Sequence, residues 1–232
     1  DCILCRGADS DSVVGGTGND QLGGGTGADT IDGGAGFDVI HGGFGDDSLV
    51  GGADGDALMG ENGNDTLEGG DGNDKLIGGD GADSQSGGAG DDFLEFSFVE
   101  GDTVDGGTGV DRMRLDDDIL NFNIVPDDRI TAIEILDLGD ADAGRSIKLQ
   151  AADVLNFEAT TGLTETGGDS IDLVIQGDAL DTVNLDSAGG ALWAMSGSQI
   201  FGGVYGAGIT YDLYTNGSEW IAIEQGVVVS ST

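Results

Sequence analysis

A single aliphatic residue recurs every nine positions through the first half of the chain. Nine tandem units run from residue 15 to residue 95, and position eight is aliphatic in every unit but one, where Gln85 stands. Successive side chains of a strand point to opposite faces, so each unit reads as a six-residue turn and a three-residue strand whose middle side chain is buried. The pattern predicts a repetitive all-β array. The aliphatic residues are Leu22, Ile31, Ile40, Leu49, Leu58, Leu67, Leu76 and Leu94.

Glycine occupies the predicted turns. Position one is glycine in all nine units, and positions two and four are glycine in eight units each, with Glu61 and Asp54 as the exceptions. Glycine permits the positive φ angles of tight turns, and its missing Cβ lets main-chain carbonyls crowd inward. Aspartate tolerates such angles better than most residues do. A degenerate unit over residues 6–14 precedes the array and keeps Asp11 and Val13 in register.

Aspartate occupies position six of every unit. One buried aliphatic residue contributes about 1.5–3 kcal/mol, which cannot offset about 1–2 kcal/mol of backbone entropy for each residue of a unit. If two units make one coil, Asp20 lies beside Asp38, and the stacked carboxylates repel one another. Carboxylates with inward carbonyls form the oxygen-only environment that Ca²⁺ prefers, so the repeat predicts a row of calcium sites. The aspartates are Asp20, Asp29, Asp38, Asp47, Asp56, Asp65, Asp74, Asp83 and Asp92.

The units resemble the G-G-x-G-x-D-x-U-x nonapeptides of RTX (repeats-in-toxin) proteins over residues 6–114. The resemblance implies a right-handed parallel β-roll with Ca²⁺ in its turns. It also implies that one turn supplies its position-six carboxylate and the carbonyls of positions two and four. The turn two units later supplies its own carboxylate and the carbonyls of positions one and three. One ion would then bind Gly16, Gly18, Asp20, Gly33, Ala35 and Asp38, and the ion on the opposite edge would bind Gly25, Gly27, Asp29, Gly42 and Asp47.

The carboxylate pairs that are two regular units apart predict about eight calcium sites, from Asp11–Asp29 to Asp74–Asp92. Beyond Glu95 the register slips by one position, because Phe96 is read as an insertion. The last two candidate pairs, Asp83–Asp102 and Asp92–Asp111, are therefore one position further apart than the others.

From Leu115 onward the sequence changes to short β-rich runs. The runs predict a β-rich C-terminal cap over residues 115–232, after a roll domain over residues 1–114, with a hairpin turning at Asn216–Gly217. "AADVLNF", residues 151–157, predicts one short helix. This half resembles the tail that follows RTX arrays in large secreted adhesins, which implies type I secretion and an extracellular or cell-surface location. The predicted strands are 130–138, 146–150, 171–176, 181–185 and 191–195.

Charge narrows the choice of partners. The chain has 45 acidic and 7 basic side chains, a formal net charge of −38. Nucleic acid needs a basic footprint, so we expect no nucleic-acid partner. No apolar run of about 18 residues occurs, so we expect no membrane insertion. The chain opens on Asp1 and has no signal peptide, so we expect it to be a piece of a longer protein.

Catalytic motifs are absent from the sequence. It has no H-E-x-x-H or G-x-S-x-G motif, and its one histidine, His41, is predicted to face outward. Cys2 and Cys5 form a C-x-x-C without further zinc ligands, which leaves a disulfide, free thiols or an intermolecular bridge open. The sequence therefore predicts a calcium-binding structural or adhesive module, not an enzyme. One alternative is a non-catalytic accessory module of a secreted polysaccharide-modifying enzyme. Another is an ice-binding roll, which position three disfavours because it lacks a regular row of Thr and Asn.

Alternate units are expected to build opposite sheets with different outer faces. The odd units carry Val39, Met59, Ile77 and Phe93, which predict an apolar strip that contacts the C-terminal half or a neighbouring molecule. The even units carry mainly polar residues and are expected to face water. At the inward position of Gln85 we expect either a loosened roll or polar partners from the C-terminal cap.

Overall fold

The computed structural model divides into two compact units, Asp1–Asp116 and Asp117–Thr232. The surroundings of side chains are described for residues 7–95, 101–114 and 129–137. The residues whose backbone the structure describes are 3–5, 7–96, 101–115, 119–121, 129–137, 146–150, 173–176, 182–186, 194–200, 210–215, 220–224 and 228–231.

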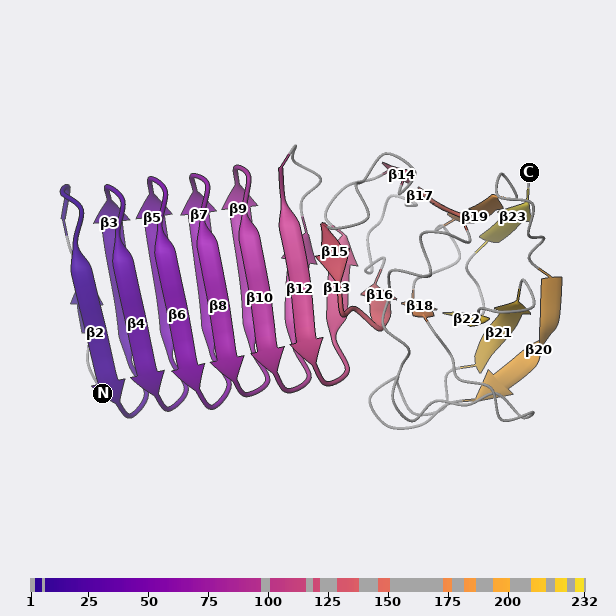
Figure 1. The fold of residues 1–232 in the computed structure, drawn as a ribbon, viewed down its shortest axis with the longest axis horizontal. Coiled ribbons are helices and arrows are strands. Elements are labelled where there is room, and N and C mark those ends of the chain that lie inside the picture. Colours follow the sequence, from indigo (N-terminus) through magenta and orange to yellow (C-terminus); the bar gives the residue numbers. More distant parts are fainter. Residues whose placement is uncertain are drawn as a thin grey trace. The chain divides into compact units, whose positions relative to one another are not determined.

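The first unit is a parallel β-roll whose strands alternate between two sheets (Figure 1). The odd-numbered strands are β1 Ile3–Cys5, β3 Gln21–Thr26, β5 Val39–Phe44, β7 Ala57–Asn62, β9 Lys75–Asp80, β11 Phe93–Phe96 and β13 Arg112–Leu115. The even-numbered strands are β2 Ser12–Thr17, β4 Thr30–Ala35, β6 Ser48–Ala53, β8 Thr66–Asp71, β10 Ser84–Ala89 and β12 Thr103–Thr108. Gln21 pairs with Val39 and Thr30 pairs with Ser48, so one coil consists of two nonapeptide units. The predicted parallel β-roll is confirmed.

The strands of the roll are longer than the sequence pattern predicted. Each strand from β2 to β10 is twice the predicted length, because pairing continues through the turn positions that open the next unit. In β3, for example, Gly25 pairs with Gly43 and Thr26 pairs with Phe44. Backbone hydrogen bonds need no side chain, so the glycine positions prolong the sheet and shorten each turn.

The core of the roll is one row of inward side chains from each sheet. All the aliphatic residues predicted at position eight are buried, with at most 2% of their surface exposed. Val13, Val104 and Met113 extend the row at both ends and are also at most 1% exposed. The prediction of the core from the nine-residue period is therefore confirmed.

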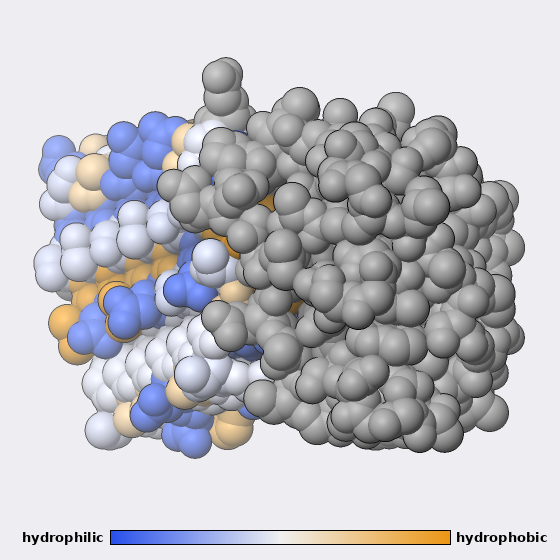
Figure 2. Space-filling view, turned by 45° about the vertical axis from the view of Figure 1, so that its right-hand side comes forward, coloured by the Kyte–Doolittle hydropathy of each residue, from blue (hydrophilic) through white to orange (hydrophobic). Residues whose placement is uncertain are grey.

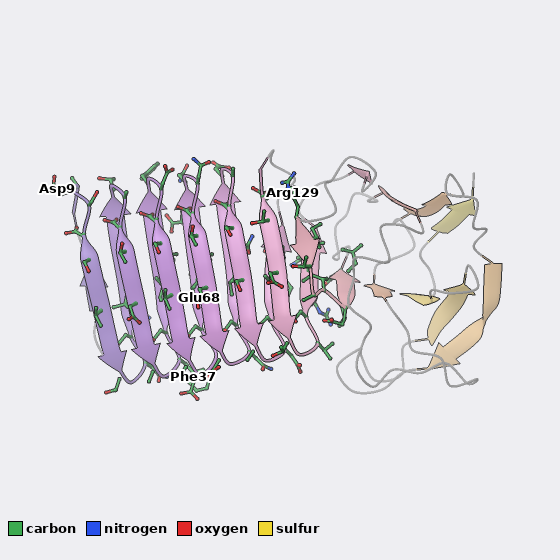
Figure 3. The ribbon with its side chains drawn as sticks, viewed as in Figure 1. Asp9, Phe37, Glu68 and Arg129 are labelled. Atoms are coloured by element: carbon green, nitrogen blue, oxygen red, sulfur yellow. The ribbon has the colours of Figure 1, made fainter. Side chains whose placement is uncertain are left out.

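The outer face of the even-numbered sheet is hydroxyl-rich. Position seven carries Ser or Thr on every even-numbered strand from β2 to β12, and these residues pair directly across the sheet. Acidic residues lie beside them at position nine of every second strand, and Glu68 can be followed in Figure 3. Figure 2 shows rows of like residues as bands along the roll. The hydroxyl row is Ser12, Thr30, Ser48, Thr66, Ser84 and Thr103.

The outer face of the odd-numbered sheet is more apolar. Met59 and Ile77 are half-buried and pair directly between β7 and β9. In the neighbouring row Lys75 separates Ala57 from Phe93, and its ammonium lies 5.7 Å from the centroid of the Phe93 ring. The apolar side chains of this face thus form two short rows with a cation set into one of them.

The second unit is also all-β over its described residues. Its strands are β14 Ile119–Asn121, β15 Ile130–Thr131, β16 Ile135–Asp137, β17 Ser146–Gln150, β18 Leu173–Gln176, β19 Thr182–Asp186, β20 Ala194–Ile200, β21 Thr210–Thr215, β22 Trp220–Glu224 and β23 Val228–Ser231. The parallel series β14–β17–β19–β23 and β16–β18–β22 alternate along the chain, as in a solenoid. β20 and β21 add antiparallel strands beside β22.

The predicted hairpin is present, with Thr215 of β21 paired to Trp220 of β22. The expected strand over 130–138 is instead two short strands, β15 and β16. The expected helix over 151–157 lies outside the described residues. Among the residues that the structure describes, no helix is long and apolar enough to span a membrane.

Candidate metal centre

The turns between strands are built from residues with positive φ. Positions two and four have φ between about 98° and 145° wherever glycine stands there, as in Gly16 (109°), Gly18 (98°) and Gly72 (145°). The two departures from glycine keep the same conformation, since Asp54 has φ 73° and Glu61 has φ 77°. The left-handed backbone is therefore a property of the turn and is retained without glycine, at some cost in strain.

Each position-six aspartate from Asp29 to Asp92 is held by three hydrogen bonds of the same kind, as Asp47 illustrates. The N–H of Asp47 donates to Oδ1 of Asp65 at 2.7 Å, and Oδ1 of Asp47 accepts the N–H of Asp29 at 2.7 Å. The carbonyl of Asp47 accepts the N–H of Thr66 at 2.9 Å. The same carboxylate-to-backbone bond repeats along both edges of the roll. Its donors are Asp11, Asp20, Asp29, Asp38, Asp47, Asp56, Asp65, Asp74, Asp83 and Asp92.

In seven of these residues the second carboxylate oxygen, Oδ2, is buried and has no hydrogen-bond partner. Buried polar atoms are almost always paired in native proteins, so a regular row of unpaired anionic oxygens needs a ligand to explain it. The buried Oδ2 atoms without a partner belong to Asp29, Asp38, Asp47, Asp56, Asp65, Asp74 and Asp92.

Main-chain carbonyls gather beside these unpaired oxygens. A Cβ placed on Gly51 would lie 2.5 Å from Oδ2 of Asp56 and 2.6 Å from the carbonyl oxygen of Gly69. The same two kinds of oxygen lie beside Gly15 and Gly33. The missing side chain at position one therefore leaves room for an oxygen-lined cradle that an alanine methyl group would fill.

Burial raises the pKa of these carboxyl groups. It raises the pKa of Asp56 and Asp65 to about 6, and that of Asp92 to about 7. Hydrogen bonds from the backbone oppose the rise, and the neighbouring carboxylates of the same row add to it. Burial also raises the pKa of Asp38, Asp47, Asp74 and Asp83. The row is therefore electrostatically unfavourable when ionised without a cation.

The donor set fits a hard cation that takes oxygen ligands. Among the described residues, no three His, Cys, Asp or Glu side chains converge on one point, so carbonyls must complete any coordination shell. Ca²⁺ accepts six to eight oxygens from carboxylates and carbonyls in flexible geometry, whereas Mg²⁺ demands strict octahedral geometry. A calcium ion would satisfy the Oδ2 atoms and neutralise the like charges of a row.

The structure brings the predicted residues of the first site together. The N–H of Asp20 donates to Oδ1 of Asp38, and the N–H of Gly18 donates to the carbonyl of Ala35, both at 2.7 Å. On the opposite edge the N–H of Gly27 donates to the carbonyl of Phe44 at 2.7 Å, next to the pair formed by Asp29 and Asp47. Asp11 is half-buried, and its Oδ2 accepts the N–H of Gly7 at 3.3 Å.

The two pairs that span the register slip have the same geometry as the others. Asp83 donates to Oδ1 of Asp102 at 2.9 Å, and Asp92 donates to Oδ1 of Asp111 at 2.8 Å. Asp102 and Asp111 are 2% and 0% exposed. The register slip therefore does not interrupt the two rows of carboxylates.

A second ladder at position five was not anticipated from the sequence. Its side-chain oxygens accept the N–H of the residue one coil later, the opposite direction to the position-six ladder. Asn64, for example, accepts the N–H of Ala82 at 2.9 Å and donates its own N–H to Asp46 at 2.8 Å. The recurrence of Asn and Asp at position five was the available signal. The ladder acceptors are Ser10, Asn19, Asp46, Asn64, Asn73 and Asp91.

The fold and the oxygen-lined turns define a calcium-binding parallel β-roll. The family model of the RTX calcium-binding nonapeptide repeat (4 copies) matches residues 7–22, 23–58 and 59–94. Residues 7–94 are therefore an RTX β-roll, a structural and calcium-binding fold. No curated protein matches the chain.

Proposed function

We propose that the chain is a calcium-dependent structural or adhesive module of an exported protein, folding when Ca²⁺ fills the turns of the roll. The row of buried, unpaired Oδ2 atoms beside glycine carbonyls carries this proposal. RTX repeats are typical of secreted proteins. An extracellular or cell-surface location reached by type I secretion agrees with that association and with the acidic composition.

The ligands of each ion would come from two turns of the same edge. One turn would contribute its aspartate and the carbonyls of positions two and four, and the next would contribute its aspartate and the carbonyls of positions one and three. The pairs from Asp11–Asp29 to Asp92–Asp111 include about eight sites in regular register and two that span the register slip. Bound calcium would supply positive charge and cross-link neighbouring coils.

Calcium would also act as a compartment switch. Extracellular calcium modules have dissociation constants of about 10⁻⁴–10⁻³ M, far above cytosolic calcium levels. Metal-binding free energy is folding free energy when the site forms only in the folded chain. The roll would therefore stay unfolded during export and fold outside the cell.

Circular dichroism with a calcium titration tests the proposal. In EGTA we expect the β signal of the roll to be absent, and we expect it to appear cooperatively at about 10⁻⁴–10⁻³ M Ca²⁺. Magnesium at the same concentration serves as the control and is expected to produce little folding. An unchanged β signal in EGTA would overturn calcium-dependent folding.

The odd-numbered sheet is our proposed contact surface of the module. Met59 and Ile77 form its adjacent apolar pair, and Lys75 supplies a cation beside Phe93. A second copy or another extracellular partner would bury this pair. No nucleic acid is proposed as a partner, because the roll has an acidic composition.

A further inference from the structure

Gln85 is the polar exception in the apolar interior of the roll. It lies in β10 and is 4% exposed, and its strand neighbours Leu67 and Val104 are each 1% exposed. Its Nε2 donates to the main-chain carbonyl of Glu95 at 3.0 Å, and its Oε1 is buried without a hydrogen-bond partner. The partner thus comes from the roll itself, which corrects the expectation of a loosened roll or of partners from the C-terminal cap.

The chain departs from the repeat next to this hydrogen bond. Glu95 pairs with Ile77 in the regular register, but its partner on the other side, Arg114, lies one position beyond the place that the repeat predicts. β11 ends at Phe96, whereas the strands from β3 to β10 continue into the turn positions of the next unit. The extra residue therefore lies between Phe96 and Thr103. The reading of Phe96 as the insertion is wrong, because Phe96 continues β11 and pairs with Leu115.

The orientation of the Gln85 amide follows from its partner. A carbonyl oxygen only accepts hydrogen bonds, so the NH₂ group must face Glu95 and Oε1 must face away. Leaving Oε1 unpaired in the interior costs free energy that a leucine would avoid. The hydrogen bond to the carbonyl of Glu95 explains why an amide stands at this buried position. This bond satisfies the Glu95 carbonyl near the end of β11.

The carboxylate rows remain in register across the extra residue. Asp83 and Asp92 still donate to Oδ1 of Asp102 and Asp111, in coils that are one residue longer than the others. We propose that Gln85 is a positioning residue for the metal-binding rows. Its amide holds the end of β11 at Glu95, so that the extra residue is absorbed before β12 and Asp102 and Asp111 keep their places. This inference rests on the proposed calcium-dependent folding.

A double-mutant cycle between Gln85 and the extra residue tests this role. Gln85→Met keeps an unbranched side chain of similar length and removes the donor. In the full chain we expect Gln85→Met to raise the calcium midpoint of folding by about threefold to tenfold, the effect of one lost hydrogen bond. In a chain that also lacks Ser97, which belongs to the segment between Phe96 and Thr103 that holds the extra residue, Gln85→Met should leave the midpoint unchanged or lower it. Equal effects in both backgrounds would overturn the proposal.

Amide hydrogen exchange in saturating calcium provides a second readout in the full chain. Gln85→Met should accelerate exchange at Asp83 and Asp92, whose N–H groups donate to Asp102 and Asp111, while Asp47 keeps its protection. Leu67→Gln is the matched control. It buries an amide at the equivalent position of the neighbouring strand β8, away from the end of β11. We expect it to raise the calcium midpoint without selective exchange at Asp83 and Asp92.

Uniform acceleration along the whole roll, or none, would contradict the role of Gln85. Calcium-dependent folding and the positioning role of Gln85 can be contradicted independently. If the unsubstituted chain folds equally well in EGTA, calcium-dependent folding is wrong. The exchange pattern would still test the role of Gln85.

Discussion

At the scale of single residues, the position-six aspartate both forms hydrogen bonds between coils and presents a carboxylate oxygen that could bind a cation. Its backbone groups and Oδ1 form the hydrogen bonds that join successive coils, as in Asp47. The Oδ2 of Asp47 is buried and has no protein partner. An asparagine could reproduce the hydrogen bonds, but it lacks the negative charge that attracts a divalent cation.

Asp65→Asn should therefore weaken calcium binding while retaining the hydrogen bond to the Asp47 N–H. We expect the calcium midpoint to rise by about tenfold or more, because each carboxylate serves the sites on both sides of it. Asp65→Ala should be worse, since it also leaves the buried N–H of Asp47 unpaired at a cost of about 1–3 kcal/mol. Calcium titration monitored by circular dichroism measures both effects.

The matched control is Asp46→Asn in the adjacent turn position. Asp46 is exposed, and its Oδ1 accepts the N–H of Asn64, which an asparagine can also do. We expect a change in the calcium midpoint below about twofold. Similar shifts for Asp46→Asn and Asp65→Asn would mean that net charge, and not a specific ligand, controls folding.

The position-one glycines provide a steric test of the same cradle. Gly51→Ala places a methyl group within 2.6 Å of both Asp56 Oδ2 and the Gly69 carbonyl oxygen, so neither oxygen can keep its place. We expect isothermal titration calorimetry to show a lower number of bound calcium ions. Gly7→Ala is the control, because no atom beyond its immediate chain neighbours lies within 4 Å of its added Cβ, and it should leave the number unchanged.

At the scale of strands, the two sheets of the roll have the same backbone but different outer faces. β7 and β9 juxtapose Met59 and Ile77, whereas β6 and β8 juxtapose Ser48 and Thr66. Both are direct cross-strand pairs on the outer face of their sheet. They therefore allow one substitution to be compared in two environments.

The double variant Met59→Glu with Ile77→Glu should disrupt any contact made by the odd-numbered sheet. We expect reduced self-association in sedimentation velocity, or a raised calcium midpoint, because two carboxylates replace an apolar contact. The double variant Ser48→Glu with Thr66→Glu adds the same charge to the hydroxyl-rich face and should be tolerated. Equal tolerance of both double variants would remove the odd-numbered sheet as a contact surface.

At the scale of the whole molecule, we expect the net charge to control when the chain can fold. The formal net charge of −38 includes two rows of buried carboxylates in the roll. Either cations or protons can relieve the repulsion within those rows. Because the pKa values of Asp56, Asp65 and Asp92 are raised to about 6 to 7, relief of this repulsion by protonation can be measured in a mildly acidic pH titration.

Acidification should therefore stabilise the calcium-free roll. The pKa of Asp56 and Asp65 rises from 3.8 to about 6 on folding, and that of Asp92 rises to about 7, so the folded state binds more protons. This stabilisation is complete below 3.8, the ordinary pKa, and is lost as the pH rises through about 6 to 7. In EGTA we expect the β signal to increase as the pH falls through this window. A β signal that is strongest in alkaline EGTA would contradict the linkage.

The nine-residue period by itself determined the parallel roll, its buried aliphatic row and the stacking of the aspartates. Each coil repeats the same local chemistry, so equivalent positions two units apart become neighbours by simple periodicity. The tertiary structure decided what local pattern cannot encode. Strand pairing prolonged the strands into the glycines, and the register across the extra residue kept Asp102 and Asp111 in the rows. The tertiary structure also gave Gln85 its partner, because the carbonyl of Glu95 is accessible to the Gln85 amide only where β11 ends beside β10. Hydrogen bonds that join different coils depend on how the coils are aligned in the folded roll. A single nonapeptide unit carries no information about that alignment.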